Sequence, residues 1–461
     1  MMKSNRSFFL LIILVLLSRI PLLFGGYGTD GDAWRIAKSA LTLWNDGIYH
    51  VSRFPGFPIY EFLQTPIIVS GGAFASNSAS IIVFIFSIVV FREIIRYWDV
   101  PNPDLLLISY AFLPILWKNS AVTMDYVWGL FGILASLYFL LNKNVLLAGI
   151  ILGLAAGTRI THIIFFIPFI FIFPKEERKQ WVLFSTAAIA TTIVCYVPVA
   201  ISENILLVLR DFLDDIVAVP LIKRAGVICY RSVFSVGLLG MVSIVIVLLT
   251  NRRRIQSVLQ TRSAVIALAI ILTGFLIFII HSDEREYLMP IFPFALVLIA
   301  FIADRKQYLV IMAALISYGF FSVDVIEHSV EHPRIGLNIQ KGYLVKEYLG
   351  RREIEESRMR VANSAIPDSS FVMIGLGPVF WLDNPLVKND RAKEKEFRQD
   401  CSRSVKGNEI YFIYGLYKPQ MEEVRRRGYR IYYWGEMKEY LQTFVGYDID
   451  DELLRPIDGS P

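Results

Sequence analysis

Charge is scarce in this sequence. Charged residues make up 19% of the 461 residues and hydrophobic residues 55%, whereas a soluble domain carries about 25% charged residues. An ordinary soluble protein is excluded, because apolar runs near the roughly 20 residues that cross a bilayer recur from Phe8 to Val323. The net charge is +5, but its basic residues sit in alternate loops and no soluble module with a basic face is evident. We therefore expect no nucleic-acid partner.

Cysteine is also scarce, with three residues in the whole chain. This count excludes a disulfide scaffold and a zinc cluster. Cys195 lies in an apolar segment and is expected to be a core residue. Cys229 and Cys401 fall on the same predicted side of the membrane, where two free thiols are expected and an oxidised pair is the alternative. The Gly-Leu-Gly of 375–377 is too little for a nucleotide loop, so no nucleotide cofactor is expected.

Apolar segments, in contrast, are abundant. Eleven are predicted to be transmembrane helices, at 8–24, 80–95, 105–117, 126–141, 145–157, 161–173, 181–201, 232–249, 263–280, 287–303 and 308–323. Lys3 and Arg6 precede the first, which we interpret as a retained helix rather than a cleaved signal peptide. Lys or Arg in every inner loop predicts a multi-pass protein of the plasma (inner) membrane, with a cytoplasmic N-terminus and an extracytoplasmic C-terminus.

The composition becomes charged and polar beyond Asp324. Segments 371–375, 409–415 and 429–435 are predicted strands, each closed by glycine, and helical patterns at 343–362 and 418–427 lie between and before them. The expected fold is therefore an α-helical polytopic membrane domain at 1–323, followed by a small extracytoplasmic soluble α/β domain at 324–461.

The first predicted outer loop carries two carboxylates, Asp30 and Asp32, where a span meets an amphipathic helix at 33–44. Carboxylates at such a junction could act as a general base or hold a divalent metal. Aspartate is also a common N-cap, and the spacing alone favours capping. The two interpretations are compatible, because one Asp can cap the helix while the other faces a cavity.

A proline turn follows in the same loop. Pro55 and Pro58 exclude a continuous helix and fix a tight turn. Arg53 and Glu61 flank this turn. They could contact a substrate, or they could form a solvated loop pair.

This arrangement resembles the GT-C class of membrane glycosyltransferases. The Ser-Arg-Ile-Pro of 18–21 ends the first span, and the Asp-bearing loop, the aromatic-capped helix, Gly-x-Tyr and Pro-Gly-x-Pro follow. The class includes protein O-mannosyltransferases, bacterial aminoarabinose transferases and oligosaccharyltransferase catalytic subunits, whose essential Asp lies in this loop. If the essential Asp is placed by its distance before the aromatic residue Trp34, as in the mannosyltransferases, it corresponds to Asp30. If it is placed by its distance before Gly47 and Tyr49, as in the oligosaccharyltransferases, it corresponds to Asp32. Gly31 stands where the mannosyltransferase pattern has Glu.

Two further motifs extend the resemblance over roughly 19–290. The Gly- and Ala-rich segment 149–159 ends in Thr-Arg, although small residues are also a general packing device in membranes. The segment 281–290 resembles the outer-loop Glu-Arg-Tyr…Pro element of the class. The resemblance implies that Arg285 and Arg159 bind the donor phosphate. It also implies that three further residues contact substrate: His162, Glu284 and Tyr287. The alternative for Glu284 and Arg285 is a salt-bridged loop.

The resemblance implies an inverting glycosyltransferase in the lipid bilayer. Its donor would be a polyprenyl-phosphate sugar, and its acceptor a glycan, lipid or protein hydroxyl on the extracytoplasmic face. A divalent metal stays open, because only Asp30 and Asp32 can be placed as candidate ligands. The alternatives are a polymerase or ligase of lipid-linked polysaccharide, a transporter or flippase of lipid-linked sugars, and a receptor or assembly subunit that acts through its soluble domain.

Overall fold

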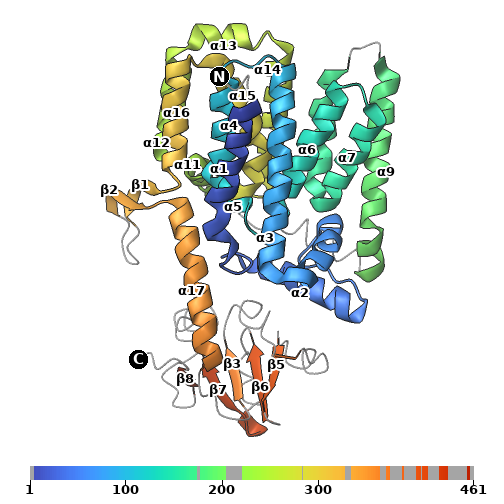
Figure 1. The fold of residues 1–461 in the computed structure, drawn as a ribbon, viewed down its shortest axis with the longest axis vertical. Coiled ribbons are helices and arrows are strands. Elements are labelled where there is room, and N and C mark those ends of the chain that lie inside the picture. The colour runs from blue at the N-terminus through green and yellow to red at the C-terminus, as the bar shows by residue number, and fades with distance from the viewer. Residues whose placement is uncertain are drawn as a thin grey trace. The chain divides into compact units, whose positions relative to one another are not determined.

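Helices dominate the computed structural model of the chain (Figure 1). The structure describes residues 5–173, 177–203, 221–282, 284–327, 334–363, 370–373, 387–388, 401–405, 408–413, 425–433 and 454–456. The chain divides into two compact units, each described here by itself. The first unit comprises Met1–Tyr27 and Ser39–Leu349, and the second comprises Gly28–Lys38 and Gly350–Pro461.

The helices follow one another with short connections. The first seven are α1 (Asn5–Leu23), α2 (Gly31–Asp46), α3 (Pro58–Tyr97), α4 (Pro103–Phe112), α5 (Pro114–Asn119), α6 (Tyr126–Leu141) and α7 (Val145–Thr158). The next are η1 (Ile160–Phe165), α8 (Phe166–Phe169), η2 (Ile170–Ile172), α9 (Arg178–Ser202), α11 (Leu221–Val236), α12 (Leu238–Thr250) and α13 (Arg252–Val258). The last are α14 (Arg262–Ile280), η4 (Arg285–Ile291), α15 (Phe292–Ile302), α16 (Arg305–Ser317) and α17 (Tyr343–Asn363).

Several helices are suited to a bilayer. Five described helices are long and apolar enough to cross a membrane: Arg6–Leu23, Pro58–Tyr97, Arg178–Ser202, Arg262–Ile280 and Arg285–Ile302. A sixth span results if α11 and α12, which are bent by 93°, count as one. Shorter apolar helices cover Pro103–Phe112, Tyr126–Leu141, Val145–Thr158 and Ile160–Ile172. These helices agree with a helical membrane protein, while the number eleven and the orientation stay predictions.

Small residues bring α7 against α9. A Cβ added at Gly149 would lie 2.5 Å from the carbonyl oxygen of Phe184, and one at Gly153 would lie 2.4 Å from Cβ of Thr191. The two helices therefore approach as closely as their backbones allow, with α6 on the other face of α7 (Figure 1). The glycines of the 149–159 motif thus serve helix packing. Cys195 of α9 is buried, as predicted.

The motif at 18–21 is also part of the packing. The guanidinium of Arg19 is fully buried, lies 4.8 Å from the ring centroid of Trp117 and donates from Nε to Ser120 Oγ at 3.2 Å. Arg19 therefore anchors α1 to the start of the segment that leads into α6.

The last predicted span, 308–323, is wrong at its C-terminal end. Helix α16 ends at Ser317, and strand β1 (Phe321–Glu327) pairs antiparallel with β2 (Arg334–Lys341). The chain turns at Gly319, where the N–H of Leu344 donates to the Gly319 carbonyl at 2.9 Å. The predicted domain boundary at 323/324 falls inside β1. The predicted span 105–117 is divided between α4 and α5, because Pro114 cannot continue the ladder of α4.

The second unit contains a six-stranded sheet in the order β4-β5-β6-β3-β7-β8. Its strands are β3 (Ser370–Met373), β4 (Val387–Lys388), β5 (Cys401–Val405), β6 (Asn408–Ile413), β7 (Arg430–Tyr433) and β8 (Leu454–Pro456). Strand β3 runs parallel to β6 and β7, and β7 runs parallel to β8. The described parts of the three predicted strands are strands, except that β7 begins at Arg430 and not at Tyr429.

Some predictions concern residues whose structure is not described. They are the first part of the helix at 418–427, Asp283, the Gly-Leu-Gly of 375–377 and the side chain of Cys401. Cys229 is exposed. The soluble α/β domain as a whole stays a prediction.

Candidate functional site

The first loop forms the helix start that its sequence predicts. Asp30 Oδ1 accepts from the backbone N–H of Asp32 at 2.9 Å, so Asp30 caps α2. Asp32, in the first turn, pairs with Arg35 at 3.0 Å. The indole of buried Trp34 donates to the Gly28 carbonyl at 2.8 Å. Capping is thus confirmed for Asp30, and a catalytic role for either Asp stays a prediction. Both belong to the second unit.

The proline turn of the first unit is held by Glu61. The side chain is buried, and Oε1 accepts from the Ser52 N–H at 2.7 Å. Oε2 accepts from the Tyr49 hydroxyl and from the Phe57 N–H, the latter at 3.3 Å. The solvated-pair alternative for Arg53 and Glu61 is wrong, because Glu61 is buried within the turn and Arg53 pairs elsewhere.

Arg53 binds a carboxylate that the sequence analysis did not single out. Its Nη2 lies 2.5 Å from Asp125 Oδ1, and Nε of Arg159 lies 2.7 Å from Asp125 Oδ2. Asp125 directly precedes α6 and Arg159 directly follows α7, so one carboxylate joins the proline turn to the ends of two helices. The side chains of Asp125 and Arg159 are 0% and 4% exposed. The third member, Arg53, has a side chain that is 12% exposed, so the triad is largely removed from solvent.

The triad carries one excess positive charge. Burial raises the pKa of Asp125, but the charges of Arg159 and Arg53 outweigh burial and hold the pKa below its usual value. Asp125 is therefore ionised, and it neutralises one of two buried guanidinium groups. Aromatic rings help to stabilise the other charge. Arg159 lies 4.1 Å from the ring centroid of Tyr126 and 4.5 Å from that of Tyr287. We call Arg53, Asp125, Tyr126, Arg159 and Tyr287 the Asp125 cluster.

Glu284 adjoins the Asp125 cluster. The Tyr126 hydroxyl donates to Glu284 Oε2. Burial raises the pKa of the Glu284 carboxyl, although Arg159 and Tyr126 act in the opposite direction. The salt-bridged loop pair proposed as the alternative for Glu284 and Arg285 does not describe this carboxylate, because its hydrogen-bond partner is a tyrosine.

Arg285 belongs to a neighbouring group. Its guanidinium lies 4.6 Å from the ring centroid of Tyr343. Glu286 Oε1 accepts from the Tyr343 hydroxyl at 3.2 Å and lies 3.4 Å from Nζ of Lys118. We call Lys118, Arg285, Glu286 and Tyr343 the Glu286 cluster. Arg285 and Tyr287 point in different directions from η4, because a 3₁₀-helix has three residues per turn. Tyr287 contacts Arg159, whereas Arg285 contacts Tyr343, so the two arginines have different neighbours.

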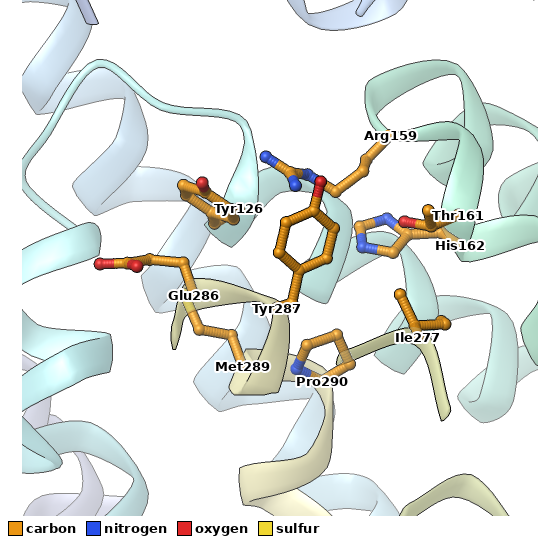
Figure 2. Close-up of a pocket in the computed structure, with 9 residues that line it drawn as sticks. All are labelled: Tyr126, Arg159, Thr161, His162, Ile277, Glu286, Tyr287, Met289 and Pro290. Carbon is orange, nitrogen blue, oxygen red and sulfur yellow. The ribbon is translucent and has the colours of Figure 1, made fainter. Parts of the chain in front are cut away.

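A small cavity lies between these groups (Figure 2). Arg159, Tyr126 and Tyr287 line it. His162 lies on one side of the Tyr287 ring, and Tyr126 and Glu286 lie on the other, with the Glu286 carboxylate directed away from the ring. Its volume is about 10 Å³, the space of roughly one water molecule. A sugar does not fit this closed arrangement, so any substrate requires the cavity to open.

His162 is packed as well as cavity-lining. The ring is buried, and its Nδ1 lies 3.3 Å from the Ala155 carbonyl. A Cβ added at Gly129 would lie 2.0 Å from Cε1 of His162, so the imidazole occupies the space that Gly129 leaves on α6. His162 thus reaches the same cavity as Arg159.

The predicted site residues of the first unit therefore gather at one end of the helix bundle, and Glu61 lies behind them in the turn. Among the described residues, four cations and three carboxylates meet there, and the buried Glu61 adds a fourth carboxylate: Arg53, Lys118, Arg159, Arg285, Asp125, Glu284 and Glu286. The sequence analysis missed Asp125, Lys118 and Tyr343. Asp125 directly precedes one predicted span and Lys118 directly follows another, but charged residues at the ends of spans are common and do not mark a site. No sequence signal marked Tyr343.

Within the described residues, no group of three or more His, Cys, Asp or Glu side chains could hold a metal ion. Comparisons of the chain with family models, with characterised proteins and with solved structures return no match.

Proposed function

We propose that the protein is a GT-C-type glycosyltransferase that moves a sugar from a polyprenyl-phosphate donor to an acceptor hydroxyl. The observation that carries this proposal is a group of arginines at one end of an apolar helix bundle, of which Arg159 is buried and Arg53 and Arg285 are partly buried. A lipid-linked donor needs apolar helices beside its chain and fixed cations at its phosphate. Aromatic rings and Asp125 hold Arg159 in one orientation, as a preorganised phosphate site requires.

The donor phosphate binds at Arg285, with Arg159 beside it in our proposal. A guanidinium offers a planar pair of N–H donors that matches two phosphate oxygens. The Glu286 cluster keeps Arg285 on the ring of Tyr343, where the Glu286 carboxylate acts on it electrostatically. Arg159, in contrast, lies 2.7 Å from an Asp125 oxygen. We therefore propose that Arg285 makes the direct contact with the phosphate and that Arg159 contributes mainly through its positive charge.

Asp30 or Asp32 acts as the base. It takes the proton of the acceptor hydroxyl while the hydroxyl oxygen forms a bond to the anomeric carbon. The bond from the anomeric carbon to the phosphate oxygen breaks, and polyprenyl phosphate leaves with the electron pair. Attack opposite the leaving phosphate inverts the anomeric centre. Asp30 caps α2 through Oδ1.

The remaining parts of the proposal concern the membrane. The chain crosses the bilayer eleven times, and the reaction takes place on the extracytoplasmic face with 324–461 on the same side. The acceptor is a glycan, lipid or protein. No nucleotide enters the reaction, and a divalent metal stays open.

Two single variants, Asp30→Asn and Asp32→Asn, test the proposal in membranes supplied with a panel of polyprenyl-phosphate sugars. Asparagine caps helices as well as aspartate does, so Asp30→Asn removes the carboxylate and keeps the cap. Asp46→Asn, at the other end of α2, is the matched control. We expect one of the first two variants to lose transfer by at least about a hundredfold while the control keeps it. Transfer at the parent rate in both would refute the catalytic assignment.

A lipid-linked sugar flippase is the second candidate. Transporters often contain broken helices, and α3 is interrupted at Gly71 and Gly72, while α11 and α12 form a bent pair. A flippase moves the labelled lipid between leaflets without forming a new glycosidic bond. The same membranes distinguish the candidates, because only the transferase places label on an acceptor.

A further inference from the structure

A second, larger cavity lies at the other end of α3. It opens where α3 ends and where α4 and α16 begin, and its volume is about 650 Å³. That volume is in the range of sites for small ligands. Three arginines line it, Arg92, Arg96 and Arg305, together with Asp99 and Asp104. We call it the Asp104 cavity.

The arginines are arranged in a way that suits an anion. Arg92 and Arg96 are four residues apart on α3, so their side chains lie on one face, where like charges repel each other. Arg92 stacks on the Phe8 ring at 4.2 Å from its centroid, and Arg96 pairs with Glu93 at 3.2 Å. An anion between the two guanidinium groups would remove the repulsion.

Arg305 meets the cavity from another helix. Its Nη1 and Nη2 lie 3.3 Å and 2.9 Å from the two oxygens of Asp104. Even so, 58% of the Arg305 side chain is exposed, and it turns toward the cavity that it lines. Three cations and two carboxylates line the space, and Glu93, which does not line it, pairs with Arg96.

The surroundings indicate a lipid rather than a soluble ligand. Ile95, Val100 and Leu107 form an apolar part of the wall. The cavity opens at the ends of apolar helices, on the side where Lys and Arg gather in the predicted inner loops. Basic pockets between helices at that level commonly bind anionic headgroups.

We propose that the Asp104 cavity binds the phosphate of an anionic phospholipid headgroup from the inner leaflet. Arg92 and Arg96 hold the phosphate oxygens, and the apolar wall contacts the glycerol and the start of the acyl chains. A free phosphate compound shares this chemistry and is the other possible source of the anion. The proposal is independent of glycosyl transfer, since the cavity lies at the opposite end of α3 from the Asp125 cluster.

The experiment measures lipid retained by the full chain. The protein is placed in nanodiscs of phosphatidylcholine and phosphatidylglycerol, extracted into mild detergent and analysed by native mass spectrometry. The double variant Arg92→Gln with Arg96→Gln is compared with the parent. Arg252→Gln with Arg253→Gln makes the same charge change in α13 and is the matched control. Thermal unfolding checks that each variant is folded.

We expect the parent and the control to retain phosphatidylglycerol selectively, and the cavity variant to retain roughly tenfold less, the loss expected for one or two charge-assisted hydrogen bonds. Equal retention by the cavity variant and the parent would overturn the proposal. Release of the bound phosphatidylglycerol by millimolar inorganic phosphate would overturn the lipid assignment in favour of a soluble phosphate compound.

Discussion

The first unit places an arginine–aspartate pair beyond each end of α3, in opposite surroundings. In the Asp125 cluster, the Arg159 and Asp125 side chains are 4% and 0% exposed, and Arg53 adds a second cation. At the Asp104 cavity, the Arg305 and Asp104 side chains are 58% and 11% exposed. The two pairs have similar distances, 2.7 Å and 2.9 Å. Their geometry is therefore a poor guide to what they do.

The two arginine–aspartate pairs differ in how far they are buried. Water solvates Arg305, so its pair is easily broken and can exchange its carboxylate for another anion. In the Asp125 cluster the side chains of Asp125 and Arg159 are buried, so the charge of each depends on the charges around it. A largely buried cluster with two arginines and one aspartate suits a reaction that develops negative charge on a phosphate, whereas an open, solvated cavity suits reversible binding.

Removing Asp125 should have the largest effect. Asp125→Ala leaves two buried guanidinium groups without a carboxylate, and we expect the free energy of unfolding to fall by about 3–5 kcal/mol. Asp104→Ala is the matched variant at the exposed pair and should change stability little. Thermal unfolding in detergent measures both. Equal melting temperatures for the two variants would show that burial does not separate the two pairs.

Substitution of Arg285 tests whether the proposed phosphate-binding residues take part in sugar transfer. Arg285→Gln should lower sugar transfer by about a hundredfold, because it removes the charge that stabilises the leaving phosphate. Arg285→Lys keeps the charge but loses the planar fork, and should recover part of the rate. Arg252→Gln in α13 is the control. Unchanged transfer by Arg285→Gln would remove this residue from the proposed site.

A variant of Glu61 distinguishes two roles for this residue, stabilising the proline turn and contacting the substrate. Glu61→Ala takes away the acceptor for the Ser52 N–H, the Phe57 N–H and the Tyr49 hydroxyl. Unsatisfied buried donors cost about 1–3 kcal/mol, so we expect a stability loss of that order. If the variant melts like the parent but fails to transfer sugar, the carboxylate contacts substrate instead.

Glu284 should give the smallest effect, a dependence of stability on pH. Its folded pKa is raised by burial. Between the ordinary glutamate value of about 4.3 and the raised pKa, the folded protein therefore binds more protons than the unfolded chain. Stability contributed by this group consequently falls as pH rises through that interval. Glu284→Gln should flatten this part of the profile of melting temperature against pH, and an unchanged profile would contradict the assignment.

Local rules were enough for several features. Helix α2, its Asp30 cap and the turn at Pro55 each follow from residues within a few positions of one another. The start of α3 at Pro58 was missed, because the span was predicted to begin only at residue 80. The strands β3, β6 and β7 follow from short β-prone runs. These elements depend on neighbours in sequence, which a single sequence displays.

Contacts between residues that are far apart in the sequence could not be predicted from local patterns. Asp125 meets Arg53 across 72 residues and Arg159 across 34, and neither spacing has a helical or strand period. The strand β1 replaced the end of a predicted span, because a tertiary contact at Gly319 turns the chain. Apolar composition alone could not distinguish that strand from a helix end. The roles of Asp30 and Asp32 depend on the same kind of long-range placement.

The most direct test is a structure of the full chain in nanodiscs with a polyprenyl monophosphate bound. The account predicts that the phosphate lies within hydrogen-bond distance of the Arg285 or Arg159 guanidinium, with the carboxylate of Asp30 or Asp32 facing the same space. A phosphate bound only in the Asp104 cavity, or carboxylates directed away from the arginines, would contradict it.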